Sequence, residues 1–407
     1  MHIFAIETLR PAIQPNILFV QLTTDQGIVG LGESFFGPRA VEAYIHETAA
    51  PVLLKMDTVS PETVFAALSP YVGYQGAGAE VRGNAAIDLA LWDALGKEAG
   101  MPLFRLLGGD NSRPLRVYNT CAGPDYIRTT TRQSSDNWGI GDETHQFDQY
   151  EDLRAFMDHP AELARELLDQ GITGMKIWPF DRAAEASGGT SISRIELAAG
   201  LSIVDKIRSE VGMEMDLMIE LHGLWNRPTA AQLVNALQPY QPFWVEDPIR
   251  ADAIHALRHL VDEVSLPIAI GETSVGRRGI LPLLRAGVVD VLTLDLQWTG
   301  GLTEAKKVAA LADAFGVPIA PHDCTGPATL AACIHLSSSQ PNTLIQETVR
   351  AFLRTWYGEL VVSVPEVING YVTCSETPGH GIELNPGVLA DPRNERRTSS
   401  AKEMGRL

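Results

Sequence analysis

The feature that most constrains the fold is a regular alternation of short apolar runs and amphipathic, helix-like segments from about Leu115 onward. Strands and helices that alternate with short loops are typical of parallel sheets built from βα units. Eight such units are the number that closes a barrel, so the alternation predicts an α/β barrel. The eight expected strands are residues 115–119, 174–178, 215–220, 242–246, 267–271, 290–294, 317–321 and 343–346.

The first part of the chain, residues 1–115, follows a different pattern and predicts a separate domain. Residues 17–23 and 27–33 have the composition of two strands joined by a short turn. Helical spacing of apolar residues follows, and the helix expected over residues 83–98 stops at Gly100. Antiparallel strands followed by helices indicate an α+β arrangement.

These patterns divide the chain into an α+β domain over residues 1–115, a barrel over 116–360, and a C-terminal segment over 361–407 that returns to the first domain. The last residues, from Asp391 onward, are polar and charged, which indicates a mobile or partner-docked tail. Within the barrel, residues 123–158 form a long polar stretch without periodicity. Such a loop in a compact domain is usually functional or disordered.

The composition limits the class of protein. Of the 407 residues, 45% are hydrophobic and 20% are charged, which is ample for a large core. No apolar run approaches the roughly 18 residues of a membrane span, and the chain does not open on a signal-peptide pattern. The net charge of −18 argues against nucleic acid and anionic membranes as partners, although a metal ion could still draw an anionic substrate. The four cysteines are far apart and form no CxxC pair, so we expect a reduced, cytoplasmic setting.

Three glutamates stand at the C-terminal ends of three consecutive expected strands. Glu220, Glu246 and Glu272 follow their apolar runs at intervals of 26 residues. In a parallel barrel, such positions converge on the face where active sites occur. Three adjacent carboxylates repel one another unless a cation neutralises them, and all-oxygen ligands favour Mg²⁺ over Zn²⁺. Each glutamate taken singly could cap a helix or pair with a loop arginine, but the equal spacing favours a magnesium site.

Ionisable residues also follow the remaining expected strands. Asp295, His322 and Glu347 come after the sixth, seventh and eighth apolar runs. An acid on the neighbouring strand can fix a histidine tautomer and raise its basicity, which favours His322 as a catalytic base over a structural histidine. Lys176, on the second strand, is positioned for a carboxylate substrate. His222, two residues beyond the first glutamate, is either a general acid or a loop histidine bonded to the backbone.

Together these residues resemble the enolase superfamily, and within it the mandelate racemase and muconate lactonizing enzyme group. The resemblance covers nearly the whole chain and includes the ordered set of Lys, three acids, Asp, His and Glu. It implies a modified TIM barrel of the (β/α)7β type with an α+β N-terminal capping domain. The further stretches that carry it are RGNAAIDLALWD at 82–93, LLGG at 106–109, WVEDP at 244–248 and IGE at 270–272.

The resemblance also implies a role for each site residue. The three glutamates would bind Mg²⁺, which holds the substrate carboxylate. His322, oriented by Asp295, would remove the proton alpha to that carboxylate. The metal, Lys176 and a protonated Glu347 would stabilise the enediolate that forms. General base catalysis worth about 10²–10⁴-fold cannot suffice for so weak an acid, so electrophilic stabilisation must supply much of the rest.

Two departures from the racemase pattern favour a dehydratase. Racemases of the group carry a second lysine two residues after the first, where this chain has Trp178, so one of the two bases is missing. His222 instead resembles the sugar-acid dehydratases of the group, in which such a histidine helps the 3-hydroxyl leave as water. The expected reaction is β-elimination from an aldonate or aldarate to a 2-keto-3-deoxy acid. Either His222 or His322 could protonate the departing hydroxide.

Aromatic residues and two loops are expected around the substrate. Trp178, Trp225 and Trp298 stand just after strand ends, where they could line the mouth against sugar C–H surfaces or pack against loops. Residues 123–158 and 34–39 would close over the substrate, as capping-domain loops do in the family. Members of the family are often symmetric oligomers, and the resemblance implies a homo-oligomer here.

Other functions fit parts of the sequence. A racemase, epimerase or cycloisomerase would begin with the same proton abstraction. Cys324 beside His322 suggests a Cys–His nucleophilic pair, but such a pair leaves three spaced acids unexplained. A zinc hydrolase would need His-x-His on the first barrel strand, where the chain reads VYN at 117–119. A non-catalytic, metal-dependent sugar-acid binder is the alternative from another class, although a ring of charged groups is costly to keep without a function.

Overall fold

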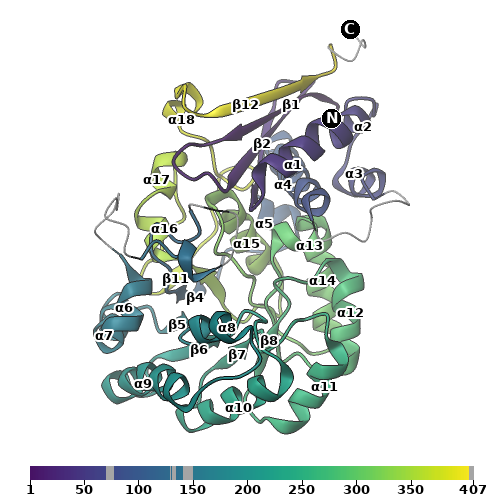
Figure 1. Ribbon diagram of the computed structural model, residues 1–407. Coiled ribbons are helices and arrows are strands. Elements are labelled where there is room, and N and C mark those ends of the chain that lie inside the picture. Colours follow the sequence, from purple (N-terminus) through teal and green to yellow (C-terminus); the bar gives the residue numbers. More distant parts are fainter. Residues whose placement is uncertain (70–77, 129, 131–133, 141–149, 403–407) are drawn as a thin grey trace.

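The computed structural model describes residues 1–69, 78–128, 130, 134–140 and 150–402. Figure 1 shows an antiparallel sheet with its helices at one end of the molecule and a curled parallel sheet wrapped by helices at the other. The expected α/β class is therefore confirmed, as are the modified TIM barrel and its α+β capping domain.

The capping domain is built on a four-stranded antiparallel sheet in the order β12-β1-β2-β3. Strands β2 (Ile17–Thr24) and β3 (Val29–Phe35) form the expected hairpin, whereas β1 (Ile3–Arg10) was not expected. Helix α4 (Ala79–Ala99) lies against β3, and a Cβ atom at Gly32 would come within 1.9 Å of the carbonyl oxygen of Ala86. The remaining helices of this domain are α1 (Pro38–Tyr44), the π-helix η1 (Ile45–Ala49), α2 (Ala50–Leu53), α3 (Pro61–Ala67) and α5 (Leu103–Leu106).

The expectation of a mobile or partner-docked tail from Asp391 is wrong for most of that segment. Strand β12 (Glu395–Ser400) pairs antiparallel with β1 and forms the edge of the capping sheet. Its side chains are polar, so the pattern carries no apolar period, but main-chain pairing and ion pairs hold it, among them Arg396 to Glu7 at 2.7 Å. Charged edge strands of this kind also resist pairing with other chains. Residues 403–407 lie outside the described part of the chain.

Seven parallel strands make the barrel sheet, in the order β10-β4-β5-β6-β7-β8-β9. The expectation of a regular strand over residues 317–321 is wrong, because this segment forms only isolated parallel bridges. Ile319 bridges Leu292 on one side and Thr343 on the other, which closes the ring between β9 and β10. The strands are β4 (Leu115–Thr120), β5 (Gly174–Ile177), β6 (Asp216–Glu220), β7 (Trp244–Glu246), β8 (Ile268–Ile270), β9 (Val291–Leu292) and β10 (Gln346–Thr348), and β11 (Tyr371–Val372) pairs antiparallel with β4.

Side chains fill the inside of the barrel, so it is a packed core and not a pore. Among the inward residues are Tyr118, Met218 and Trp244, which form one buried cluster with residues of the other strands. No described helix is long and apolar enough to span a membrane. The helices of this part are α6 (Asp152–Asp158), α7 (Pro160–Asp169), α8 (Asp181–Ser187), α9 (Arg194–Val211), α10 (Arg227–Leu237), α11 (Ile254–Glu263), α12 (Gly276–Ala286), α13 (Leu296–Thr299), α14 (Leu302–Ala314), α15 (Pro327–Ser339), α16 (Arg350–Arg354), α17 (Tyr357–Leu360) and α18 (Pro386–Ala390), with 3₁₀ turns η2 (Ser135–Asn137) and η3 (Gln238–Tyr240).

Two buried carboxylates of the capping domain hold the barrel by capping its helices. Glu33, in β3, accepts hydrogen bonds from the N–H of Ala328 (3.0 Å) and the hydroxyl of Thr329 (2.8 Å) at the start of α15. Asp88, in α4, accepts from the N–H (2.9 Å) and hydroxyl (2.5 Å) of Thr303 at the start of α14. Burial raises the pKa of each of these two carboxyls to about 7, against the opposing effect of the hydrogen bonds. The junction between the two domains is therefore polar, and these two buried carboxylates have hydrogen-bond partners there.

Candidate active site

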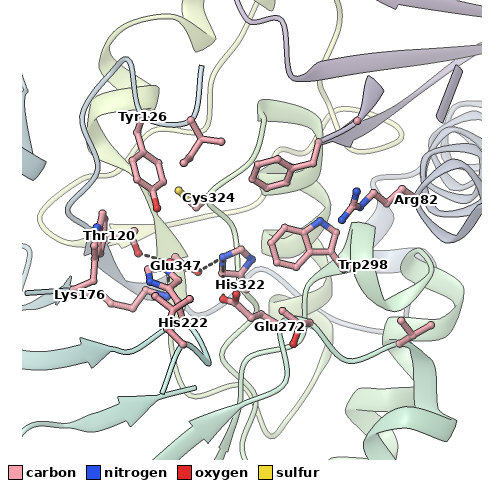
Figure 2. A pocket seen from close by; sticks show the side chains of 17 residues that line it. Arg82, Thr120, Tyr126, Lys176, His222, Glu272, Trp298, His322, Cys324 and Glu347 are labelled. Carbon is pink, nitrogen blue, oxygen red and sulfur yellow. Dashed lines mark hydrogen bonds and ion pairs between the residues drawn. The ribbon is translucent and has the colours of Figure 1, made fainter. Parts of the chain in front are cut away.

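A cavity of about 540 Å³ opens at the C-terminal ends of the barrel strands, where the capping domain meets the barrel. Its volume is within the range of small-molecule sites. Figure 2 shows side chains from both domains converging on it. The sequence-predicted residues Lys176, Trp178, His222, Glu272, Trp298, His322 and Glu347 line it.

The three predicted metal ligands come together beneath this cavity. Glu220 ends β6, Glu246 ends β7, and Glu272 stands two residues after β8. Each offers one carboxylate oxygen, and these atoms lie within 4.8 Å of one another. Oε2 of Glu220 and Oε1 of Glu246 are buried, and among the described residues their only polar contact is with the ammonium of Lys176. Converging, buried carboxylate oxygens of this kind fit a hard divalent cation such as Mg²⁺.

The pKa values of two of the three carboxylates are raised, which points the same way. Burial, followed by the neighbouring carboxylates, raises the pKa of Glu246 to about 8, although Lys176 opposes the shift. The pKa of Glu272 is also raised, again mainly by burial. Burial also acts to raise the pKa of Glu220, but His222 and Lys176 outweigh it and the pKa is lowered instead. A cation between the three carboxylates would offset the burial and the repulsion that act on Glu246 and Glu272.

Lys176 lies among the acids and not apart from them. Its Nζ is 3.0 Å from Oε1 of Glu347, 3.1 Å from Oε1 of Glu246 and 3.5 Å from Oε2 of Glu220. Burial alone would lower the pKa of Lys176, but the surrounding carboxylates hold it well above its usual range. A charged ammonium thus stands at the cavity floor, where it can meet an anionic group.

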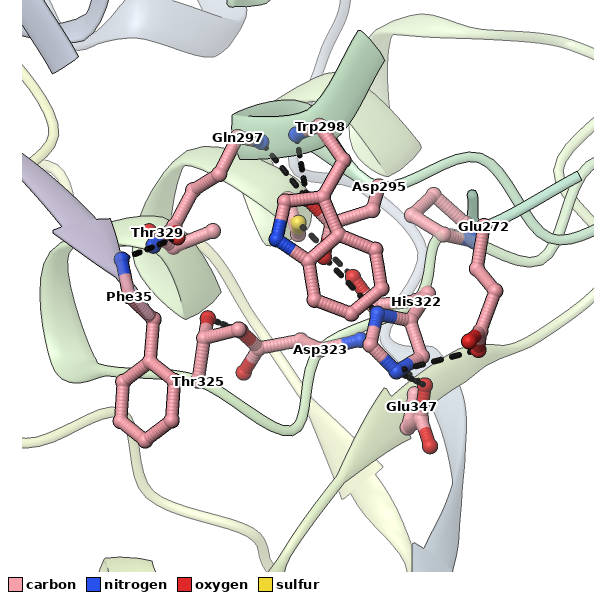
Figure 3. A network of polar contacts seen from close by, with 12 residues as sticks. Phe35, Glu272, Asp295, Gln297, Trp298, His322, Asp323, Thr325, Thr329 and Glu347 are labelled. Atoms are coloured by element: carbon pink, nitrogen blue, oxygen red, sulfur yellow. Dashed lines mark hydrogen bonds and ion pairs between the residues drawn. The ribbon is translucent and has the colours of Figure 1, made fainter. Parts of the chain in front are cut away.

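His322 and Asp295 form the predicted pair (Figure 3). Nδ1 of His322 lies 2.8 Å from Oδ2 of Asp295, and the other oxygen of this aspartate accepts from the N–H groups of Gln297 (2.7 Å) and Trp298 (2.9 Å). Nε2 of the imidazole faces Oε2 of Glu272 at 3.3 Å. The aspartate is thus fixed by its own backbone contacts, and only Nε2 is left to act on a bound molecule.

The charge of His322 depends on its neighbours. Burial lowers the pKa of the imidazole, but Glu272 and Glu347 outweigh burial and raise it well above its usual range. A cation that neutralised these carboxylates would remove much of this effect and bring the imidazole closer to the behaviour of a base.

Glu347 lies between two cationic side chains, Lys176 and His322. It lies 4.0 Å from His322, accepts a hydrogen bond from the N–H of Asp323 (2.8 Å), and also accepts one from the hydroxyl of Thr120. Burial raises the pKa of Glu347, but Lys176 and His322 outweigh it and bring the pKa to about 2. Two cationic side chains adjoin the carboxylate and favour its ionised form in this arrangement, so the protonated Glu347 that the resemblance implies stays a prediction.

A second histidine–acid pair was not predicted. Nδ1 of His222 lies 2.7 Å from Oδ2 of Asp181, the first residue of α8. Burial opposes the charged imidazole, but Asp181 and Glu220 raise the pKa of His222 to about 10. The missed signal was an acid a few residues beyond the second expected strand. His222 is thus bonded to a side chain and not to the loop backbone, and its Nε2 is left for the cavity.

The tryptophans are divided between the cavity and the core. Trp298 lies over the imidazole of His322, with ring centroids 5.2 Å apart. Trp178 lines the cavity but is also buried against Phe156 and His222, so packing and lining apply together. Trp225 is buried and does not line the cavity.

The two expected loops contribute in part. Phe36 and Gly37 of residues 34–39 line the cavity, as do Tyr126 and Ile127 of residues 123–158. Within the second loop, residues 129, 131–133 and 141–149 lie outside the described part of the chain. Sequence reasoning named neither Thr120 nor Arg82 as a site residue, and both line the cavity.

The rival Cys–His nucleophile is not supported. Cys324 lines the cavity, but burial and the nearby Glu347 raise the pKa of its thiol well above the usual range. A nucleophilic cysteine needs a lowered pKa, because the thiolate is the reactive form.

Two family profiles match most of the chain. The family profile described as "Mandelate racemase / muconate lactonizing enzyme, N-terminal domain" matches residues 4–108, and that described as "Enolase C-terminal domain-like" matches residues 159–388. Curated relatives include a D-galactonate dehydratase from Ralstonia pickettii, 29% identical over 97% of this chain and 95% of the relative. Another D-galactonate dehydratase, from Xanthomonas euvesicatoria, is 30% identical over 96% of this chain and 94% of the relative.

Solved structures agree over the full length. An enolase of the mandelate racemase subgroup from Agrobacterium tumefaciens is 42% identical, with a TM-score of 0.87 over 99% of this chain and all of that one. A putative dehydratase from Zymomonas mobilis is 26% identical, with a TM-score of 0.84 over 98% of this chain and 99% of that one.

Proposed function

The chain belongs to the mandelate racemase and muconate lactonizing enzyme family of the enolase superfamily, and on this premise we propose that it is a Mg²⁺-dependent sugar-acid dehydratase. One observation carries the proposal: three buried carboxylates lie beside a charged lysine and a histidine–aspartate pair in one cavity. Relatives named D-galactonate dehydratase, which match over nearly the full chain, support the reaction class.

The binding step follows from the cluster of acids. Glu220, Glu246 and Glu272 would hold the cation, because one oxygen of each converges on the same buried space. When bound, Mg²⁺ supplies Lewis-acid stabilisation of negative charge on a substrate carboxylate. Lys176 adds a fixed positive charge at the same floor and would orient that carboxylate.

His322 would act as the base. Its Nε2 faces the cavity and takes the proton alpha to the carboxylate, while Asp295 accepts the hydrogen bond from Nδ1–H and stabilises the imidazolium that results. The electron pair of the broken C–H bond moves toward the carboxylate and gives an enediolate. The ammonium of Lys176 would stabilise this added charge.

Loss of water completes the reaction. The electron pair of the enediolate forms a C2–C3 double bond as the C3–O bond breaks, and the departing hydroxide takes a proton. His222 is placed for that transfer, because Asp181 engages its Nδ1 and leaves Nε2 toward the cavity. The enol product then rearranges to a 2-keto-3-deoxy acid.

One observation favours an epimerase as the second candidate. The site holds two histidine–acid pairs, His222 with Asp181 and His322 with Asp295, and both histidines line one cavity. Two bases on opposite faces of one carbon could remove and return a proton without elimination. The two candidates share the first proton abstraction and differ only in the product.

The test is a screen of the purified protein with Mg²⁺ against mono- and diacid sugars, with semicarbazide to detect 2-keto-3-deoxy products. A hit would support dehydration and identify the substrate. Proton NMR of the same mixtures in D₂O distinguishes the alternatives, since exchange with a stereoisomer as product means an epimerase. If no sugar acid shows either proton exchange or product formation, the catalytic proposal is refuted and a binding role is favoured. In the same assays, His322→Asn should lose both exchange and product. His255→Asn, on the exposed face of α11, is its matched control.

The substrate, the assembly and the cellular setting are proposals of the same kind. We propose a small-molecule sugar acid, an aldonate or aldarate, as the substrate, in line with the names of the relatives. The homo-oligomer and the cytoplasmic setting stay predictions, which sedimentation of the purified protein and fractionation of its host cells would check.

A further inference from the structure

Arg82 is a cation in the cavity wall that the proposed chemistry does not use. It comes from α4 of the capping domain, and its side chain is partly buried. The other basic groups of the cavity each have acidic partners: Lys176, His222 and His322. Arg82 has no ion pair with any described residue, and its buried Nε lacks a hydrogen-bond partner there.

The position of Arg82 is at the end of the cavity away from the acids. Figure 2 shows Trp298 between Arg82 and His322, with Lys176 on the far side of His322. The ring of Phe36 links these groups, because it lies 6.0 Å from the guanidinium carbon of Arg82 and 5.9 Å from the ring of Trp298. A substrate held by its carboxylate at the floor would therefore extend toward Arg82.

The wall next to Arg82 is held in a strained shape. Phe36 has φ of 70°, a conformation that bulky side chains rarely adopt. Its N–H donates to the carbonyl of Asn16 (3.0 Å), and the N–H of Phe35 donates to Oε1 of Gln297 (2.6 Å). Such strain persists where surrounding contacts over-determine it, and it gathers at functional sites. The neighbouring Gly37 has no side chain, so it leaves the approach to the guanidinium open.

We propose that Arg82 binds the second carboxylate of a sugar diacid, so that the substrate class is the aldarates and not the aldonates. A partly buried cation without a direct ion pair is costly: burial lowers the pKa of Arg82, and the longer-range attraction of Asp295 and Glu80 does not outweigh it. A carboxylate that pairs with the guanidinium in two hydrogen bonds recovers that cost. Phe36 and Gly37 shape the pocket around that second carboxylate. This assignment rests on the proposed function, because it takes the first carboxylate to lie at the acid cluster.

The experiment compares matched six-carbon diacids and monoacids that share their hydroxyl configuration. Calorimetry measures their binding to Mg²⁺-loaded protein carrying His322→Asn, which should prevent turnover. A charge-assisted pair predicts that the diacid binds about 10- to 100-fold more tightly than the monoacid. Arg82→Met should abolish this ratio, and Arg82→Lys should keep part of it. Arg285→Met, which removes an exposed charge in the last turn of α12 outside the cavity, should leave it unchanged.

The outcomes separate the inference from the function. Equal binding of diacid and monoacid, or a diacid preference that survives Arg82→Met, overturns the assignment of Arg82. If the wild-type protein then still exchanges the α-proton of a monoacid in D₂O, the dehydratase proposal stands without it. If no sugar acid binds and none exchanges, both proposals fall together.

Discussion

Asp88 offers a direct test of what holds the two domains together. Its carboxylate caps α14 from α4, and two effects compete at this position. A helix N-terminus and two hydrogen bonds favour the charged form, whereas complete burial disfavours it. Burial prevails, and the pKa of Asp88 rises from 3.8 to about 7.

The sign of the pH effect follows from this shift. The folded protein binds the proton more tightly than the unfolded chain, so stability falls as the pH rises from about 4 to about 7. One proton over that interval corresponds to about 4 kcal/mol. Asp88→Asn keeps the shape and cannot ionise, so it removes this dependence. The variant should match the wild type near pH 4 and become more stable than it by several degrees of thermal midpoint near pH 8.

Scanning calorimetry at a series of pH values measures the difference between the two midpoints. Asp262→Asn, on the exposed face of α11, serves as the matched control, and its difference from the wild type should stay flat. If Asp88→Asn instead loses stability relative to the wild type as the pH rises, the helix terminus prevails over burial and the reasoning is refuted.

Three further predictions concern the site. Glu246→Gln keeps the bond from the indole N–H of Trp244 but removes a charge, so Mg²⁺ affinity by calorimetry should fall at least about 10-fold, and unchanged affinity would contradict the three-acid site. His322→Asn should reduce α-proton exchange with D₂O by about 10²-fold or more, whereas persistent exchange would mean that another base acts. Asp181→Asn should slow elimination by about 10²–10⁴-fold and leave α-proton exchange intact, because it disturbs His222 alone; a parallel loss of both would place His222 in the first step.

The sequence predicted the residues whose position depends on the barrel period. Glu220 and Glu246 end neighbouring parallel strands and face each other in register, so their spacing along the chain translates directly into proximity. The bridge between Asp295 and His322 follows the same rule, even though no regular strand forms at 317–321. Parallel register repeats from unit to unit, so such contacts can be predicted from the spacing of residues in the sequence.

Two site residues that were not predicted lie on elements other than the barrel strands. Asp181 starts a helix after its strand, and Arg82 reaches the cavity from a helix of the capping domain, so neither belongs to the series of strand ends. The pairing of β12 with β1 joins positions almost 400 residues apart and has no apolar period to reveal it. The lowered pKa of Glu347 depends on Lys176 and His322, whose distances from the carboxylate only the folded arrangement supplies.

The reacting groups and the groups proposed to select the substrate lie in different domains. The barrel strands carry the acids, Lys176 and His322, and their register leaves little freedom. Phe36 and Arg82 belong to the capping domain, and within the described part of the chain neither forms a hydrogen bond or ion pair with His322 or with the three glutamates. A substitution at Arg82 can therefore alter which acid is bound without moving the base or the metal ligands. Proton abstraction and substrate selection should accordingly separate in mutants, with exchange chemistry retained when the diacid preference is lost.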